Sequence, residues 1–276
     1  MRARLIPLFR TSRSEWSVTI LALNGFRTVM DQETNGLGFS QTATLDELLE
    51  IASRKFEVHF EPIAIQDTKL DILQISDLEE YIDRLAESTG PDQTLQLPFW
   101  AKIWPTSILL SYYVQRLADS SQGSLLEIGG GIGLCGLTAA ARGMRVCISD
   151  SDPDALLFAR INILKNNLQD LAEIARADFT ASRLPQRYTY IAGSEVLYRE
   201  EHYQPLLAFL REHLQSVPEA EIVLARDYRI GAKAFFRAAR EQFSIQEKTL
   251  GYRETTDSTS QGERHLCAIT RLRPLA

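Results

Sequence analysis

Three glycines alternate with other residues in one short loop, at positions 129, 131 and 133 of the 276-residue chain. The loop follows a short apolar run and precedes a helix-like segment, and glycines at such a turn let the backbone approach a ligand closely. A dinucleotide fingerprint would have its third glycine at position 134, which is Leu134 here, and a P-loop would add a Lys-Ser or Lys-Thr pair that this segment lacks. The spacing therefore predicts a ligand site of a different kind.

Two carboxylates accompany this loop. Glu127 precedes Gly129 by two residues, where a carboxylate repels a pyrophosphate but suits a cationic group such as an ammonium or a sulfonium. Asp150 follows the loop by about 20 residues, at the tip of the next predicted strand, where an acid can accept both hydrogen bonds of a ribose diol. Alternatively, Asp150 or Asp152 caps the helix that follows, and Asp152 is the better placed of the two.

Further candidate ligand contacts lie after the third predicted strand and ahead of the glycine loop. Asp178 can accept a hydrogen bond from an adenine amine while Phe179 covers the ring; the alternative is a turn acid beside a core aromatic. Trp104, at the start of a predicted helix, can form a wall against a flat ligand. The alternative, hydrophobic cover for the sheet edge, is the interpretation that we favour for Trp100. Together with the glycine loop, these side chains indicate a pocket for S-adenosylmethionine (AdoMet).

The segment after the fourth predicted strand carries a carboxylate and a phenol three residues apart, Glu195 and Tyr198. They would face the reactive end of the ligand, where Glu195 orients an amine through a hydrogen bond and Tyr198 lines the acceptor channel with its ring. Alternatively, Glu195 caps a helix that begins near Glu200. His202 is expected to lie exposed on the first turn of that helix.

Strand-like and helix-like segments alternate from residue 97 to the end, which is typical of a doubly wound, mostly parallel α/β sheet. The last two strands follow each other without a helix and predict a terminal antiparallel hairpin. Arg271 and Arg273, near the end, are expected to be solvated. The expected strands are 124–128, 145–149, 174–178, 188–193, 221–225, 243–250 and 265–272, and the expected helices are 106–117, 134–142, 153–166, 203–214 and 232–242.

A different pattern precedes residue 97. Residues 44–96 predict a small α+β extension: a helix capped by Thr44 or Asp46, a strand over 56–60, its hairpin partner over 70–75 and a helix capped by Asp77. Residues 1–43 have weak periodicity and predict a poorly ordered extension, and residues 97–276 form the main domain. The first 14 residues contain four arginines and no acid, which leaves open a targeting segment or an unstructured, mis-started terminus.

Several of these motifs occur together in a known family. The Trp-Pro-Thr-Ser segment at 104–107, the Leu-Glu-Ile-Gly-Gly-Gly-Ile-Gly segment at 126–133, the strand-end Asp150 and the Glu195-x-x-Tyr198 motif resemble methyltransferase family 16. This family comprises seven-stranded, Rossmann-like AdoMet-dependent enzymes, many of them protein-lysine methyltransferases, and the resemblance covers roughly residues 97–230. It implies that the acid-x-x-aromatic motif lies beside the transferred methyl. It also implies an AdoMet site formed by Trp104, Glu127, Gly129, Gly131, Asp150 and Asp178.

The resemblance implies an N-methyltransferase that modifies lysine side chains of a protein substrate. Two other functions stay open: methylation of a small amine or pyridine, and a non-catalytic module that binds AdoMet. Glu127 and Leu134 disfavour an NAD-dependent oxidoreductase. Neither Asn-Pro-Pro-Tyr nor Asp-Pro-Pro-Tyr occurs in the sequence, which disfavours methylation of amino groups in nucleic acids.

The amino-acid composition excludes further classes of protein and of binding partner. Apolar residues make up 45% and charged residues 24%, as in ordinary globular proteins, which excludes a wholly disordered chain and a disulfide scaffold. The net charge of -6 disfavours general nucleic-acid binding. No apolar run approaches the roughly 20 residues that cross a bilayer, so no membrane partner is expected. Three widely spaced cysteines without a Cys-x-x-Cys motif offer no metal framework and predict a reducing, cytoplasmic location.

Overall fold

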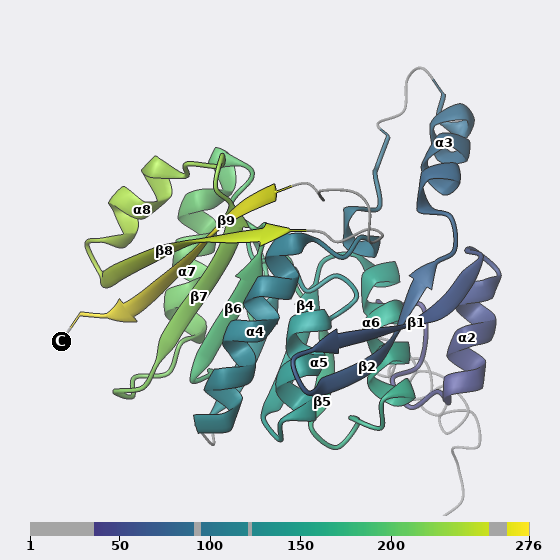
Figure 1. Cartoon of the computed structure of the whole chain (residues 1–276), viewed down its shortest axis with the longest axis horizontal. Coiled ribbons are helices and arrows are strands. Elements are labelled where there is room, and N and C mark those ends of the chain that lie inside the picture. Colours follow the sequence, from purple (N-terminus) through teal and green to yellow (C-terminus); the bar gives the residue numbers. More distant parts are fainter. Residues whose placement is uncertain (1–35, 91–94, 121–122, 254–263, 276) are drawn as a thin grey trace, which may run out of the picture.

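The computed structural model describes residues 36–90, 95–120, 123–253 and 264–275 (Figure 1). Its strands are β1 (Val58–Ile65), β2 (Thr68–Ile75), β3 (Ser124–Ile128), β4 (Arg145–Asp150), β5 (Ala172–Arg176), β6 (Tyr190–Ser194), β7 (Glu221–Asp227), β8 (Phe243–Arg253) and β9 (Arg264–Pro274). Its helices are α2 (Leu45–Ser53), α3 (Leu78–Ser88), α4 (Pro105–Ser120), α5 (Leu134–Ala141), α6 (Pro153–Lys165), α7 (Tyr203–His213) and α8 (Lys233–Ala239), with the short 3-10 turns η1 (Phe99–Ala101) and η2 (Glu200–His202).

Seven of the strands form one sheet in the order β5-β4-β3-β6-β7-β9-β8. Neighbours are parallel from β5 to β7, whereas β9 runs antiparallel to both β7 and β8. The hairpin of β1 and β2 forms a separate antiparallel sheet. The predicted α/β sheet, doubly wound and mostly parallel with a terminal antiparallel hairpin, is therefore confirmed, as is the hairpin of the N-terminal extension.

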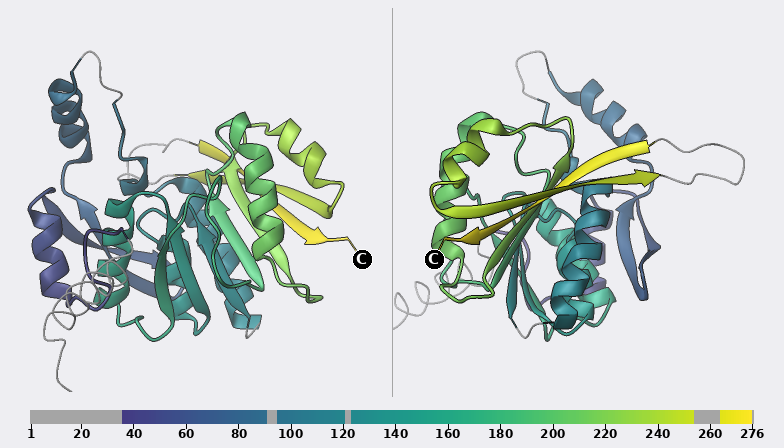
Figure 2. Two further views of the ribbon diagram at one scale, coloured as in Figure 1. Left: turned by 180° about the vertical axis from the view of Figure 1, so that it is seen from behind. Right: turned by 60° about the vertical axis from the view of Figure 1, so that its left-hand side comes forward.

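Helices cover both faces of the large sheet (Figure 2). The helices α4, α5 and α6 pack on one face together with the β1–β2 hairpin, and α7 and α8 pack on the other. Alternate residues of β3 enter the two cores, since Leu125 belongs to the first cluster and Leu126 to the second. Because the parallel strands all end at the same edge, the loops that follow β3, β4, β5 and β6 come together there.

Local capping explains why the helix starts follow the sequence. Asp152 caps α6 by accepting a hydrogen bond from the Asp154 amide at 2.8 Å. Thr44 forms a capping box at the start of α2, and Asp77 caps α3. Within the described ranges, no helix is long and apolar enough to cross a membrane.

At two of the strand boundaries that differ from the prediction, other groups take the backbone hydrogen bonds. β5 ends at residue 176 rather than 178, since the Asp178 carboxylate accepts a hydrogen bond from the Thr180 amide at 2.8 Å and turns the chain. β6 begins at residue 190 rather than 188, because the Tyr188 amide donates to the carbonyl of His213 at the end of α7. Asp178 therefore lies two residues beyond its strand, and Glu195 follows its strand directly.

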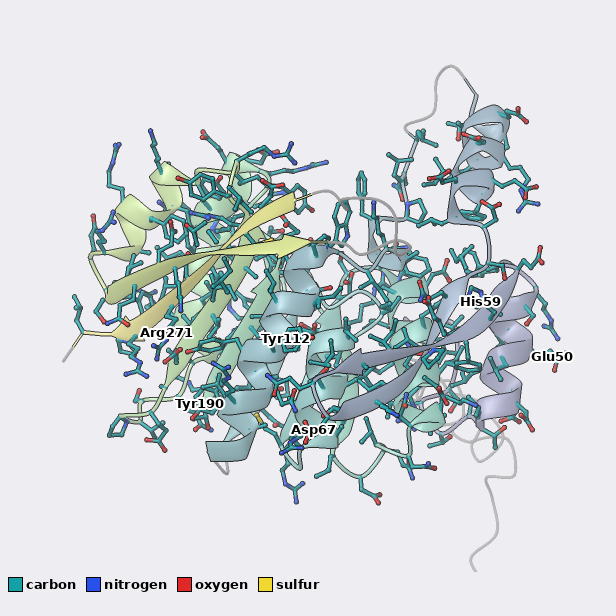
Figure 3. The ribbon with its side chains drawn as sticks, viewed as in Figure 1. Glu50, His59, Asp67, Tyr112, Tyr190 and Arg271 are labelled. Carbon is teal, nitrogen blue, oxygen red and sulfur yellow. The ribbon has the colours of Figure 1, made fainter. Side chains whose placement is uncertain are left out.

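The β1–β2 hairpin is bound to the glycine loop through one buried side chain of α6. Asn162 accepts a hydrogen bond from the Leu73 amide at 2.7 Å and donates to the Ile132 carbonyl at 3.0 Å. The hairpin turn is also held, since Asp67 accepts a hydrogen bond from Gln115 of α4 at 2.6 Å (Figure 3). Leaving a buried polar group such as the Asn162 side chain unpaired costs about 1–3 kcal/mol. The extension therefore supports the loop that forms the site.

The prediction that residues 1–43 are poorly ordered is wrong for their last part. Leu37 and Phe39 are each 4% exposed and join the same hydrophobic cluster as Phe158 of α6. The Arg176 side chain donates a hydrogen bond to the Gly36 carbonyl at 2.7 Å. Residues 1–35, with the possible targeting segment, lie outside the described residues. The domain boundary at residue 97 stays a prediction, although the hairpin and the main domain share this cluster.

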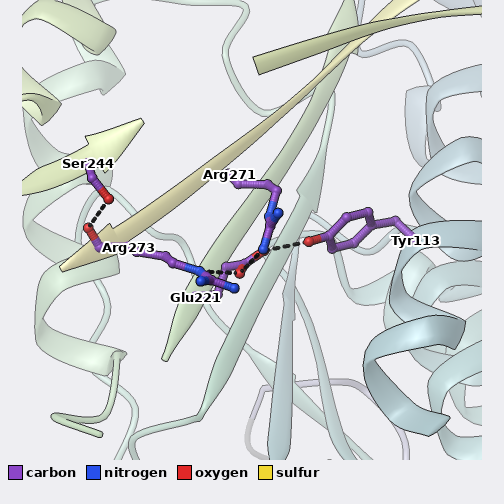
Figure 4. A network of polar contacts seen from close by, with 5 residues as sticks. All are labelled: Tyr113, Glu221, Ser244, Arg271 and Arg273. Carbon is purple, nitrogen blue, oxygen red and sulfur yellow. Dashed lines mark hydrogen bonds and ion pairs between the residues drawn. The ribbon is translucent and has the colours of Figure 1, made fainter. Parts of the chain in front are cut away.

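The expectation that Arg271 and Arg273 are solvated is wrong for Arg271, whose side chain is half-buried, whereas the Arg273 side chain is 53% exposed as expected. Both lie on β9 and pair with Glu221 of β7, whose side chain is fully buried (Figure 4). Each arginine Nε lies 2.7 Å from a Glu221 carboxylate oxygen, and the Tyr113 hydroxyl of α4 donates to the same carboxylate at 2.6 Å. Only the antiparallel pairing of β7 with β9, which nothing local encodes, brings these residues together.

Candidate active site

One cavity of about 920 Å³ lies at the carboxyl ends of the parallel strands, and all eight residues that the sequence predicted for the site line it. They come from the residue before α4, from β3 and the glycine loop after it, from the last residue of β4, from the segment after β5 and from the turn after β6. The structure therefore brings every predicted position to one place. The eight are Trp104, Glu127, Gly129, Gly131, Asp150, Asp178, Glu195 and Tyr198.

The glycine loop has a backbone conformation that other residues disfavour. The φ angle is 56° at Gly129 and 54° at Gly131, in the left-handed region. A Cβ atom on Gly131 would lie 2.7 Å from the carbonyl oxygen of Trp100. Position 131 therefore requires glycine both for its φ angle and for this close approach.

Glu127 lines the cavity and also anchors the helix that follows the loop. Its side chain is buried, and its Oε2 accepts a hydrogen bond from the Gly136 amide in the first turn of α5 at 2.8 Å. Burial raises the pKa of Glu127 to about 8. A Cβ atom on Gly136 would lie 2.7 Å from the same oxygen. Sequence analysis missed Gly136, although its place three residues after Gly133 was visible.

Asp150 is held by the backbone on both oxygens. Its Oδ2 accepts a hydrogen bond from the Gly131 amide at 2.9 Å, and its Oδ1 accepts one from the Asp152 amide at 3.0 Å. Burial raises the pKa of Asp150. Because Asp152 is the cap of α6, Asp150 is not needed for that role and faces the cavity.

Asp178 combines the two arrangements that the sequence allowed. Its Oδ1 accepts hydrogen bonds from the amide and the hydroxyl of Thr180, at 2.8 Å and 2.6 Å, so it is a turn acid. The hydrogen bond from the Thr180 hydroxyl is the main cause that lowers the pKa of Asp178. Asp178 nevertheless lines the cavity, as does the half-buried Phe179 beside it.

The two tryptophans of the segment before α4 have different surroundings. Trp104 is half-buried against the cavity, and its Nε1 donates to the Phe99 carbonyl at 3.0 Å. Lys102 Nζ lies 5.1 Å from the centroid of the Trp104 ring. Trp100 also lines the cavity, and its ring packs edge-on against Phe158 of α6 at 4.9 Å between ring centroids, so it provides hydrophobic cover over this helix rather than at the sheet edge.

Glu195 has an unusual backbone that fixes its carboxylate. Its φ angle is 55°, a conformation that costs a residue with a side chain roughly 1–2 kcal/mol. Hydrogen bonds to the end of β7 offset this cost: the Glu195 amide donates to the Ala225 carbonyl, and Glu195 Oε1 accepts from the Asp227 amide, both at 2.9 Å. Burial raises the pKa of Glu195. No side chain caps α7 or η2, so the alternative of a capping role for Glu195 is wrong.

Tyr198 lies at the cavity mouth and is 61% exposed. Its ring has an edge contact with His202 at 6.3 Å between centroids, and the Arg199 guanidinium lies 5.8 Å from its centroid. The expectation that His202 is exposed is wrong, since it is half-buried and lines the cavity. Its position results from contacts with two rings, Tyr198 and Phe179.

The threonine of the Trp-Pro-Thr-Ser segment has a contact that the sequence did not predict. Thr106 is 2% exposed, and its hydroxyl accepts a hydrogen bond from Ser194 at the end of β6 at 2.9 Å. Thr106 also hydrogen-bonds to Glu195 and counteracts the rise of its pKa. The start of α4 is therefore tied to the turn that carries Glu195 and Tyr198.

These features fit a cationic nucleoside ligand of the AdoMet type. Burial is the main cause that raises the pKa of both Glu127 and Asp150, and the charge of Asp150 adds to the rise at Glu127 as that of Asp152 does at Asp150. A cation in the cavity would remove this repulsion. Gly129 and Gly131 line the cavity with backbone alone, which lets a ligand approach the chain closely, and a Cβ at either position would instead meet Val196 or the Trp100 carbonyl.

Comparisons with solved structures agree with the fold. A SAM-dependent methyltransferase from Agrobacterium tumefaciens superposes with a TM-score of 0.54 at 17% identity, covering 79% of this chain and 71% of that chain. A putative RNA methyltransferase from Pyrococcus horikoshii superposes with a TM-score of 0.51 at 15% identity, covering 72% and 98%. The chain thus shares the Rossmann-like fold of these methyltransferases, with its cavity at the carboxyl ends of the parallel strands.

Sequence comparison identifies the family. The model of methyltransferase family 16, described as lysine methyltransferase, matches residues 92–242, more than half of the chain. Similar relatives are the protein N-lysine methyltransferases METTL21A of Danio rerio (29% identical over 53% of this chain and 70% of the relative) and of Mus musculus (30% over 54% and 71%). The histone-arginine methyltransferase METTL23 of Mus musculus is 29% identical over 47% and 53%. The chain belongs to methyltransferase family 16 and is an AdoMet-dependent methyltransferase.

Proposed function

We propose that this chain transfers the methyl group of AdoMet to lysine side chains of a protein substrate. The observation that carries this proposal is that the glycine loop and the Glu195–Tyr198 turn line the same cavity. The family and the names of the relatives support it. When bound, AdoMet supplies a methyl group on a positively charged sulfur; transfer to an amine forms an N–C bond as the C–S bond breaks, leaving S-adenosylhomocysteine (AdoHcy) and a proton.

The residues around the glycine loop would hold the cofactor. Asp150 accepts hydrogen bonds from the ribose diol, because each of its oxygens keeps a free lone pair beside the amide that it already accepts. Asp178 faces the adenine amine. Glu127, Gly129 and Gly131 surround the cationic methionine end, and Trp104 forms a wall of the cavity.

Glu195 would orient the acceptor amine. A lysine with its ordinary pKa of about 10.4 needs about 4 kcal/mol to lose its proton at pH 7.4, and burial beside a sulfonium lowers that cost. The hydrogen bond from the Asp227 amide holds the Glu195 carboxylate in one place, where it accepts a hydrogen bond from the amine. Tyr198 would line the channel with its ring face. Glu195→Ala should lower turnover about ten-fold with unchanged AdoHcy affinity, whereas the neighbouring exposed Glu200→Ala should change neither; full activity of Glu195→Ala would remove the assignment.

The surroundings of the cavity mouth favour a macromolecular acceptor. Phe99 and Tyr198 line the cavity and are 62% and 61% exposed, as large apolar side chains at docking surfaces are. The α3 helix stands apart from the body of the molecule, and none of its residues is buried (Figure 1). We propose that residues 44–85 and this mouth form the docking surface. A small-molecule acceptor would not need such a surface.

The acceptor can be identified with tritiated AdoMet. The full chain is incubated with a cell lysate, the products are separated by size, and labelled protein is hydrolysed to amino acids. We expect label on protein and in methyllysine. Label in methylarginine would match the relative METTL23 instead, and label only in small molecules would contradict a protein acceptor. AdoMet binding without label anywhere would indicate a non-catalytic module. The control is Asp150→Ala, which should not bind AdoMet and should therefore transfer no label.

We also propose a cytoplasmic location. The three cysteines, Cys135, Cys147 and Cys267, are buried and free, which suits a reducing compartment. Fractionation of cells that express the tagged full chain would test this, and recovery in an oxidising compartment would contradict it.

A further inference from the structure

His202 occupies a position in the cavity that none of the roles above explains. It ends the short η2 turn and its ring lies between two others, with centroids 6.2 Å from Phe179 and 6.3 Å from Tyr198, at interplanar angles of 77° to both. Phe179 directly follows Asp178 in the chain. His202 therefore faces the end of the cavity where the adenine of AdoMet is expected, on the side that opens toward Tyr198.

The two nitrogens of this imidazole differ. Nδ1 is buried and has no hydrogen-bond partner among the described residues. A buried N–H without a partner costs about 1–3 kcal/mol and is rarer in proteins than a buried acceptor without one. A tautomer with its hydrogen on Nε2 leaves Nδ1 as an unpaired acceptor, the less costly of the two arrangements, and makes Nε2–H the donor of a side chain that lines the cavity. A protonated ring would leave the Nδ1–H unpaired.

A donor at this place complements the acceptor that Asp178 offers. Adenine has an amine donor on C6 and, next to it, ring nitrogens that only accept, N1 on one side and N7 on the other. Asp178 suits the amine, and its ionised form is favoured mainly by the hydrogen bond from the Thr180 hydroxyl. An Nε2–H suits a neighbouring ring nitrogen. Hypoxanthine has the reverse pattern along the edge with N1, an oxygen acceptor beside an N–H donor.

We propose that His202 is a specificity-determining residue for the purine base of the cofactor, and that it donates a hydrogen bond from Nε2 to a ring nitrogen beside the C6 amine. This inference rests on the placement of AdoMet in the cavity. It gives the η2 turn a role in cofactor recognition, separate from the role of Glu195 and Tyr198 toward the acceptor.

Calorimetry with three ligands tests this without any acceptor or turnover. The ligands are AdoHcy, its hypoxanthine analogue, which carries N–H at position 1, and its 7-deaza analogue, which lacks N7. The wild-type chain should lose affinity for at least one of the two analogues. In His202→Phe, which keeps a ring between Phe179 and Tyr198, AdoHcy affinity should fall about 3- to 10-fold, the worth of one hydrogen bond. The discrimination against the 7-deaza analogue should then disappear, or that against the hypoxanthine analogue should shrink to the part that results from the lost contact of Asp178 with the C6 amine.

Two further variants separate recognition from packing. His202→Gln supplies an amide N–H and should restore the discrimination, and His59→Phe, which removes an exposed imidazole far from the cavity lining, should leave all three ligand affinities unchanged. Equal loss of affinity for all three ligands in His202→Phe would mean that the ring only packs, and unchanged affinities would mean that it makes no contact; either result overturns the proposal. Failure of the wild-type chain to bind AdoHcy would instead overturn the cofactor site itself.

Discussion

The buried carboxyl of Glu127 predicts an unusual dependence of stability on pH. Its pKa is about 8 in the folded chain, against an ordinary value of 4.5, because burial disfavours the charged form. Between these two values the folded state keeps a proton that the unfolded state releases. The contribution of Glu127 to stability is therefore fully present below pH 4.5 and is lost as the pH rises through 8.

The size of the effect follows from the two pKa values. Linkage gives a loss of about 3 to 4 kcal/mol in the free energy of unfolding between pH 5 and pH 8. Glu127→Gln removes the titration and keeps an oxygen that can accept the hydrogen bond from Gly136. The free energy of unfolding of Glu127→Gln minus that of the wild type should therefore grow by this amount over the same range.

Urea unfolding at pH 5, 6, 7 and 8, followed by tryptophan fluorescence, measures this difference. Glu241→Gln, a change at an exposed position, is the matched control and should differ from the wild type by a constant amount. A difference between Glu127→Gln and wild type that stays constant with pH would refute the argument that Glu127 is buried with a raised pKa.

Three other substitutions test the supports of the site. Gly131→Ala should destabilise the chain by about 2 kcal/mol or more in thermal unfolding and weaken AdoHcy binding, because its Cβ would meet the Trp100 carbonyl. The control is Gly143→Ala, which also has a positive φ but lies in open space and should lose only the stability that its backbone strain costs. Glu221→Gln should lower the unfolding free energy by about 2–4 kcal/mol, since it leaves two arginines without a carboxylate; a loss below 1 kcal/mol in urea titration would contradict a supporting role for this pair. Asn162→Ala should lower the free energy of unfolding by about 2–3 kcal/mol and should also reduce AdoHcy affinity in calorimetry, because it disconnects the hairpin from the glycine loop. Unchanged AdoHcy affinity would mean that the hairpin does not support the cofactor site.

Much of the fold could be predicted because its signals are local. Asp152 caps α6 through an amide two residues away, and the apolar run of β3 is followed at once by the glycine loop. These signals gave the alternation of strands and helices and therefore the mostly parallel sheet. The positions that line the cavity also followed, because parallel strands place their carboxyl ends together.

The rest depends on contacts between distant segments. Nothing near Glu195 indicates a left-handed backbone, which is held by Ala225 and Asp227 on β7. His202 was expected to be exposed because its burial depends in part on the ring of Phe179, which follows another strand. The pairing of Arg271 with Glu221 requires the register of β7 and β9, 50 positions apart in the chain. The spacing of apolar residues indicates which face of a helix or strand is buried, but it does not indicate which distant side chains pair with one another.

The crystal structure of the AdoHcy complex tests the central claim most directly. The account predicts the ribose on Asp150, the adenine beside Asp178 and the sulfur directed toward the turn of Glu195 and Tyr198. A sulfur directed away from that turn, or AdoHcy bound anywhere other than this cavity, would contradict it.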